Sequence, residues 1–142
     1  PETHLIPLIF DAVDGKRDAL TIFGTDYGTP DGTCIRDYVH VCDLVEAHVL
    51  GLKWLQEGRG SRVFNLGTGD GFSVREVVEH AEQVTKRPVP LKKGARRVGD
   101  CTKLLSGSSR AVSELGWSAT RSNMKQMITD AWRWHQKGAY EK

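Results

Sequence analysis

Two short segments of the chain carry residue types that could bind a phosphorylated ligand. In "CIRDYVHV", Arg36 begins an expected strand, and Tyr38 projects from the same face because side chains alternate along a strand. In "GARRVGD", Arg96 and Arg97 precede a glycine turn and Asp100. Guanidinium groups match phosphate oxygens, and a carboxylate accepts hydrogen bonds from neighbouring hydroxyls. Together these residues suit a diphosphate attached to a sugar, although an Arg–Asp pair taken alone is more often a surface ion pair.

A glycine-rich loop is a second candidate, for a dinucleotide. The run "VFNLGTGDGFSVREVVEH" contains an expected strand, three close glycines and a capped helix. The dinucleotide fingerprint needs G-x-G-x-x-G and an acidic residue about 20 positions further on. Here the third glycine comes one residue early, "KRPVP" has no carboxylate where one is needed, and Asp70 would repel a phosphate. We therefore predict a simple turn, and no dinucleotide site, at Gly67, Gly69 and Gly71.

Other common sites are missing from the sequence. No histidine pair has metal-ligand spacing, and neither a nucleophile elbow nor a Walker loop occurs. Cys34, Cys42 and Cys101 form neither a disulfide framework nor a zinc motif, which favours reduced thiols in a cytoplasmic protein. We assign no metal site and no catalytic residue to the chain.

Composition argues against nucleic-acid and membrane partners. The 20 lysines and arginines nearly balance 18 acidic residues, and the basic run "KRPVPLKKGARR" lacks interleaved aromatic side chains. No apolar run approaches the roughly 18 residues of a membrane-spanning helix. The 142 residues have the length of one domain. Because the chain begins with Pro1 and not with methionine, we expect a piece of a longer protein.

Hydrophobic periodicity and capping residues predict alternating helices and strands, and hence an α/β fold. The expected helices are 5–15, 43–58, 73–85, 108–116 and 122–138; the expected strands are 19–23, 36–41, 62–66, 89–93 and 102–107. We expect capping boxes at Asp43 with Glu46 and at Ser73 with Glu76. The buried side of the last helix should contain Met124, Met127, Ile128, Ala131 and Trp134.

Four segments in chain order carry a family resemblance. "PETHLIP", "LTIFGTDYGTPDGTCIRDYVHVCDL", "VFNLGTGDGFSV" and "RRVGD…LGW" resemble the UDP-glucose 4-epimerases, which are extended short-chain dehydrogenase/reductases. The similarity covers nearly the whole chain and is most specific from Phe23 to Leu44. It implies that residues 1–142 are the C-terminal UDP-sugar-binding region. It also implies that residues 42–67 supply a helix and a strand that pack on the N-terminal Rossmann domain and complete its sheet.

The resemblance also implies a set of substrate-binding residues. These are His4, Leu5, Phe23, Arg36, Tyr38, Arg97, Asp100 and Leu104. Leu5 matches a residue beside the UDP, His4 matches one near the phosphates, and Phe23 matches one that faces the uridine. Several members of the family have asparagine where His4 stands.

The remaining positions of that set divide between the diphosphate and the two sugars. Arg36 and Tyr38 match residues that contact the diphosphate and its surroundings, and Arg97 matches a second diphosphate-binding arginine. Asp100 matches a ribose-binding carboxylate. Leu104 falls where side-chain size limits the 2-substituent of the hexose, and its intermediate size favours plain hexoses over N-acetylhexosamines.

The family reaction needs parts that this chain lacks. In the family, tightly bound NAD⁺ takes a hydride from C4 of the hexose, a Tyr-x-x-x-Lys pair supplies the base, and the 4-keto sugar rotates before hydride returns. This chain contains no Tyr-x-x-x-Lys and no usable dinucleotide loop. The resemblance therefore implies that NAD binds to an N-terminal domain, that the parent enzyme is a cytoplasmic homodimer acting on UDP-glucose and UDP-galactose, and that the isolated chain is inactive.

Two other interpretations remain open. The chain could belong to a related enzyme for another nucleotide sugar, such as a pentose 4-epimerase or a dehydratase. It could also be a non-catalytic UDP-sugar-binding module.

Overall fold

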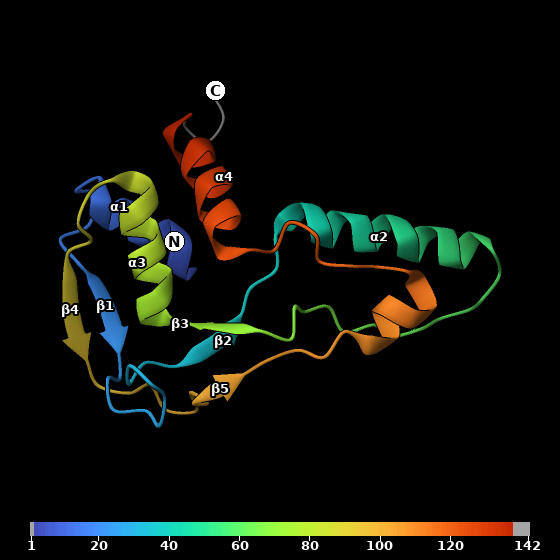
Figure 1. The fold of residues 1–142 in the computed structure, drawn as a ribbon, viewed down its shortest axis with the longest axis horizontal. Coiled ribbons are helices and arrows are strands. Elements are labelled where there is room, and N and C mark those ends of the chain that lie inside the picture. Colours follow the sequence, from blue (N-terminus) through green and yellow to red (C-terminus); the bar gives the residue numbers. More distant parts are fainter. Residues whose placement is uncertain (1, 138–142) are drawn as a thin grey trace.

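The computed structural model describes residues 2–137 and confirms the α/β class. A compact lobe packs three helices beside two parallel strands (Figure 1). The helices are α1 (Leu5–Val13), α3 (Val74–Thr85) and α4 (Met124–Gln136), and the strands are β1 (Leu20–Phe23) and β4 (Leu91–Gly94). Apolar side chains from all three helices and from β1 form its core. α3 begins at the capping box of Ser73 and Glu76 that the sequence predicts.

A three-stranded sheet leads from the compact lobe toward the rest of the molecule. Its strands are β2 (Ile35–Asp37), β3 (Gly71–Ser73) and β5 (Lys103–Leu104), in the order β3-β2-β5. β2 pairs antiparallel with β3 and parallel with β5, so that Arg36 stands opposite Phe72 on one side and Leu104 on the other. The central strand therefore sets the relative positions of segments that are far apart in the sequence.

An arm projects from the compact lobe (Figure 1). It consists of α2 (Val41–Gln56), residues 59–66 and the short helix η1 (Ala111–Leu115). Its small core contains Ala47, Ala111 and Trp117, of which Trp117 is almost fully buried. Nε1 of Trp117 donates a 2.8 Å hydrogen bond to the backbone oxygen of Asp43, which fastens η1 to the root of α2.

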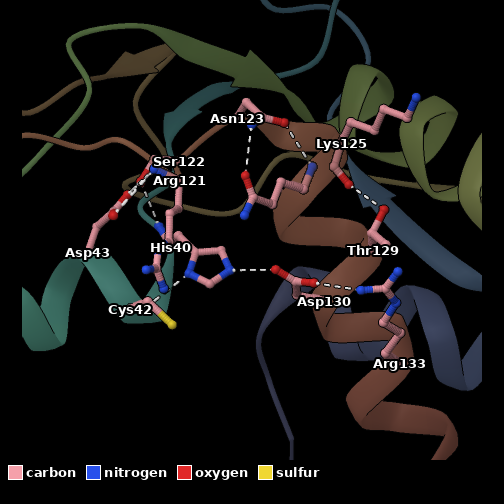
Figure 2. A network of polar contacts seen from close by, with 11 residues as sticks. His40, Cys42, Asp43, Arg121, Ser122, Asn123, Lys125, Thr129, Asp130 and Arg133 are labelled. Carbon is pink, nitrogen blue, oxygen red and sulfur yellow. Dashed lines mark hydrogen bonds and ion pairs between the residues drawn. The ribbon is translucent and has the colours of Figure 1, made fainter.

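The N-terminus of α2 differs from the expected capping box of Asp43 and Glu46. His40 is the N-cap residue, and its Nδ1 accepts a 3.0 Å hydrogen bond from the backbone N–H of Cys42. Asp43 lies inside the first turn and is fully buried, and its carboxylate accepts a 2.5 Å hydrogen bond from the Ser122 hydroxyl (Figure 2). The prediction was wrong because this tertiary contact, 79 positions away, takes the side chain that a local cap would use.

Residues 62–66 do not form the expected strand. No strand in the described part of the chain lies beside them to supply a ladder of hydrogen bonds, and Val63 is 76% exposed. The neighbouring α2 has exposed apolar side chains at spacings of three and four, which place them on one face of the helix. These are Val41, Val45, Val49, Leu52 and Leu55. Within residues 2–137, the arm therefore has an uncovered apolar face.

The buried side of α4 matches the expected one except at Trp134, because Met124 and Met127 are buried and Ala131 packs against the core. Ile128 is buried as expected, but Trp132 is 8% exposed and Trp134 is 56% exposed. Trp132 follows Ile128 by four residues on the same face, and its ring lies 5.1 Å from that of Phe10. The expected end of this helix at Gly138 lies outside the described residues. Across residues 2–137, no helix is both long and apolar enough to cross a bilayer.

Candidate functional site

Most of the expected substrate-binding residues converge on one cavity of about 450 Å³. It lies where the compact lobe meets the three-stranded sheet, between the N-terminal segment, β1, β2 and the loop after β4. Six of the eight expected residues line it: Leu5, Phe23, Arg36, Tyr38, Arg97 and Asp100. The fold thus gathers into one place residues that are spread over much of the sequence.

Arg36 is held firmly in the wall of this cavity. Its Nη1 donates 2.8 Å hydrogen bonds to the backbone oxygens of Ile35 and Cys101. Its Nη2 lies 3.4 Å from Oδ1 of Asp100, and only 24% of its side chain is exposed. A guanidinium has five N–H donors, so these contacts leave part of the fork for an anionic ligand. The two backbone contacts fix the cation before any ligand arrives.

Arg97 supplies a second cation, in a different setting. Its guanidinium carbon lies 3.8 Å from the centre of the Phe23 ring, and the Arg97 residue is exposed to solvent. A cation over an exposed aromatic ring gains only about 0.5–1 kcal/mol, so this arginine can leave the ring readily. The cavity therefore combines one fixed guanidinium with one that is lightly held.

Tyr38 also lines this wall of the cavity. Burial raises the pKa of the Tyr38 hydroxyl to about 12, so that it remains protonated at neutral pH. A protonated phenol cannot serve as a general base.

Two expected residues lie outside the cavity. The His4 side chain is 84% exposed, and its Nδ1 lies 2.6 Å from Oε1 of Glu2. Leu104 is exposed and lines an adjacent hollow of about 450 Å³, which is also lined by Arg36 and Asn65. Arg36 therefore stands at the junction of the two spaces, with Leu104 beyond it.

The structure also shows cavity residues that the sequence did not reveal. Arg17 and Cys34 line the cavity, and Cys34 is buried. Arg17 follows the end of α1 without any recognisable motif, so only the fold could place it here. Arg96, in contrast, lies 4.3 Å over the ring of Tyr27 and donates a 2.8 Å hydrogen bond to Asp26. It braces a loop and is not among the cavity-lining residues.

The glycine loop between residues 67 and 71 already holds an anion from within the chain. The Asp37 carboxylate accepts hydrogen bonds from the backbone N–H of Thr68 (3.1 Å), its hydroxyl (2.7 Å) and the Gly69 N–H (3.4 Å). A Cβ on Gly67 would lie 2.5 Å from Oδ2 of Asp37, so only glycine fits there. A pyrophosphate cannot occupy the same loop while the Asp37 carboxylate holds these donors.

Comparisons with known proteins agree with this geometry. Residues 2–67 match the model of the NAD dependent epimerase/dehydratase family. The UDP-glucose 4-epimerase of Streptococcus mutans is 46% identical over 135 residues, which cover 95% of this chain and 40% of that protein. This chain is related to the UDP-glucose 4-epimerases. The resemblance drawn from the sequence is confirmed.

Solved structures support the same relationship. A crystal structure of UDP-glucose 4-epimerase is 51% identical and superposes with a TM-score of 0.95 over 100% of this chain and 44% of that one. The UDP-glucose 4-epimerase of Bifidobacterium longum in complex with NAD⁺ and UDP is 34% identical, with a TM-score of 0.85 over 95% of this chain and 40% of that one. The present chain thus spans about 40% of the length of the UDP-glucose 4-epimerases that it matches.

Proposed function

We propose that this chain is the UDP-sugar-binding part of a longer NAD-dependent UDP-glucose/UDP-galactose 4-epimerase. The observation that carries the proposal is the meeting of Arg36, Arg97 and Asp100 with the aromatic ring of Phe23 in one cavity. Two cations, a diol acceptor and a flat apolar face match the diphosphate, ribose and uracil of UDP.

The cavity residues divide the work of holding such a ligand. Arg36 and Arg97 neutralise the diphosphate, Phe23 faces the base, and Asp100 accepts hydrogen bonds from the ribose hydroxyls. Leu104 beside the adjacent hollow offers the hexose only van der Waals contact. The nucleotide is therefore held more tightly than the hexose. The proposed reaction requires this difference, because the hexose must rotate while the UDP stays in place.

The remaining parts of the enzyme lie on another segment of the parent protein. We assign NAD to an N-terminal Rossmann domain, because solved relatives contain NAD whereas Asp37 fills the glycine loop here. Residues 42–67 dock on that domain, and residues 62–66 add a strand to its sheet. The exposed apolar stripe of α2 and the missing ladder partner of residues 62–66 support this arrangement.

The parent enzyme acts in the cytoplasm, as a homodimer, in galactose metabolism. Within residues 2–137, all three cysteines are free, which agrees with a reducing compartment.

The binding half of the proposal can be tested by titrating the chain with UDP and with uridine at low and high ionic strength. We expect UDP to bind more tightly than uridine, and this advantage to shrink as salt screens the arginine–phosphate contacts. Equal affinities for UDP and uridine would contradict the diphosphate assignment.

The fragment half of the proposal can be tested by incubating the chain with UDP-galactose and NAD⁺. We expect no UDP-glucose to form, because the chain has no Tyr-x-x-x-Lys pair. A time course that shows conversion by the pure chain would overturn the proposal that catalysis needs the rest of the enzyme.

A further inference from the structure

We propose that Asp37 is a positioning residue for the UDP-sugar site: held by the glycine loop in the manner of a bound anion, it fixes the strands that carry Arg36 and Leu104. The inference rests on the proposed function for its ligand. Asp37 does not line the cavity that contains Arg97 and Asp100, and at the edge of the adjacent hollow both of its carboxylate oxygens are occupied by hydrogen bonds from Thr68, Gly69 and Ser106. It acts through its neighbours.

The hydrogen bonds of the Asp37 carboxylate join all three strands of the second sheet at one end. Asp37 lies at the end of β2, and its Oδ1 accepts two hydrogen bonds from Thr68, which precedes β3. Its Oδ2 accepts from the Gly69 N–H at 3.4 Å and from the Ser106 N–H, which follows β5, at 3.1 Å. One side chain therefore ties both outer strands to the central one.

The strands that Asp37 ties together carry the residues at the junction of the two hollows. Arg36 is adjacent to Asp37 and stands opposite Leu104 in the β2–β5 register. Ser106, the β5-side donor to Asp37, lies only two residues beyond Leu104. If β5 slipped relative to β2, the distance between the Arg36 guanidinium and the Leu104 side chain would change at once.

The backbone packs closely around the Asp37 carboxylate at two glycines. The position of a Cβ on Gly67 lies 2.5 Å from Oδ2 of Asp37 and 2.5 Å from the backbone oxygen of Ser106. A Cβ on Gly71, which pairs with Asp37 across β2 and β3, would lie 2.4 Å from the Leu105 side chain. Because glycine has no Cβ, the backbone at Gly67 and Gly71 can lie close to Asp37 and to the segment after β5. The loop therefore encloses the carboxylate and packs against both strands.

The electrostatics favour the ionised carboxylate in this place. Burial raises the pKa of Asp37, but hydrogen bonds from Thr68, Ser106 and Gly69 outweigh this effect and leave the pKa below its usual range. An ionised side chain accepts all four contacts at once, whereas an amide of the same shape would direct an N–H toward other N–H groups. The charge is therefore required, and the shape alone is not sufficient.

The test compares three forms of the full chain: wild type, Asp37→Asn, and Asp70→Asn as a matched control. Asp70 is exposed in the same loop, so its replacement removes the same charge without changing the tie between strands. UDP and UDP-glucose are titrated into each form at a temperature where all three are folded. We expect Asp37→Asn to bind both ligands about tenfold more weakly, and Asp70→Asn to stay within about twofold of wild type.

A second readout does not depend on ligand binding. In ¹H–¹⁵N and methyl spectra without ligand, we expect Asp37→Asn to shift the Arg36 Nε–H and the Leu104 methyl resonances, and Asp70→Asn to leave both in place. If Asp37→Asn does not fold, Thr68→Val replaces it: this change removes the 2.7 Å hydroxyl donor and keeps the charge, and the same resonances should move by a smaller amount.

The outcomes separate this inference from the proposed function. If the wild type binds no UDP, the proposed function fails, and the ligand-free spectra still decide the role of Asp37. If the wild type binds UDP and Asp37→Asn binds it equally well with unshifted Arg36 and Leu104 signals, the inference fails while the proposed function stands. A lowered melting temperature with unchanged affinity would show that Asp37 is only structural, and would also overturn the inference.

Discussion

The compact lobe and the arm differ in how much of their apolar surface they bury. In the lobe, α1, α3 and α4 bury Phe10, Val77 and Ile128 almost completely against one another. In the arm, α2 buries Ala47 but leaves Val45 and Leu52 each 57% exposed. Both regions belong to the same 142 residues. The lobe buries its large apolar side chains among its own elements, whereas the arm has the surface of an element that packs on a neighbour.

The largest effect should come from the lobe, at the fixed cation of the cavity. We expect Arg36→Met to weaken UDP binding about 100-fold, or roughly 3 kcal/mol, because it removes a charged donor pair and leaves two backbone oxygens without their partner. Calorimetric titration measures this change. Arg59→Met on the arm is the control, since Arg59 lies beside Trp54 far from the cavity; equal losses in both variants would remove the distinction between the two regions.

The next effect should appear in stability, at the link between the two regions. Asp37→Asn should lower the free energy of unfolding by about 1–2 kcal/mol, because several charge-assisted hydrogen bonds are lost. The pKa of Asp37 is depressed in the folded state. Its contribution is therefore present above the unfolded value near 3.9 and is lost as pH falls through the folded value.

Urea unfolding between pH 7 and pH 3 measures this contribution. The stability difference between wild type and Asp37→Asn should narrow at the acidic end of that range. A gap that stays constant down to the lowest pH would show that the carboxylate is not the titrating group.

A smaller effect is expected at the lightly held cation. Arg97→Met should weaken UDP binding about tenfold and flatten the dependence of affinity on salt, because one phosphate contact is lost from an exposed position. The measurement is a series of titrations at increasing ionic strength. Arg133→Met, on α4, serves as the control; a salt dependence unchanged from wild type in Arg97→Met would assign the phosphates to other residues.

The smallest change in stability should come from the arm. Val45→Glu combined with Leu52→Glu should alter the free energy of unfolding by less than about 1 kcal/mol, because both side chains are exposed. The same change should reduce self-association of the chain in sedimentation velocity runs, since it interrupts the apolar stripe. Val98→Glu in the lobe, where the side chain is exposed alone, should have no such effect. If the wild-type chain remains monomeric at high concentration, the apolar stripe alone does not cause self-association.

The sequence was most informative where the signal is local. Arg36 and Tyr38 line the same cavity as expected, although the expected strand 36–41 is wrong: β2 ends at Asp37 and α2 begins at Val41. The residues Ser73 and Glu76 correctly predicted the start of α3. The register that sets Leu104 opposite Arg36 could not be read from the sequence, because it depends on pairing between distant segments.

The errors at Asp43 and at residues 62–66 depend on partners that the local sequence does not reveal. Asp43 is a residue type that often caps helices, but here its carboxylate accepts a hydrogen bond from the Ser122 hydroxyl. Residues 62–66 have the composition of a strand, but a strand forms only where a ladder partner is present. No local pattern in the glycine loop indicated that Asp37 would accept hydrogen bonds from Thr68 and Gly69.

The root of the arm has a mechanical consequence. At that root, Ser122 accepts a hydrogen bond from the His40 N–H and donates one to Asp43, and Nε2 of His40 lies 3.2 Å from Asp130 of α4 (Figure 2). α2 has 16 residues, so it reaches about 24 Å from this joint. A rotation of about 5° at the joint would move the far tip by roughly 2 Å, whereas a displacement of only about 1 Å can cost an enzyme a hundredfold in rate. These few hydrogen bonds therefore set the angle at which α2 projects from the cavity-bearing lobe, and a small change in them would be amplified along the length of the helix.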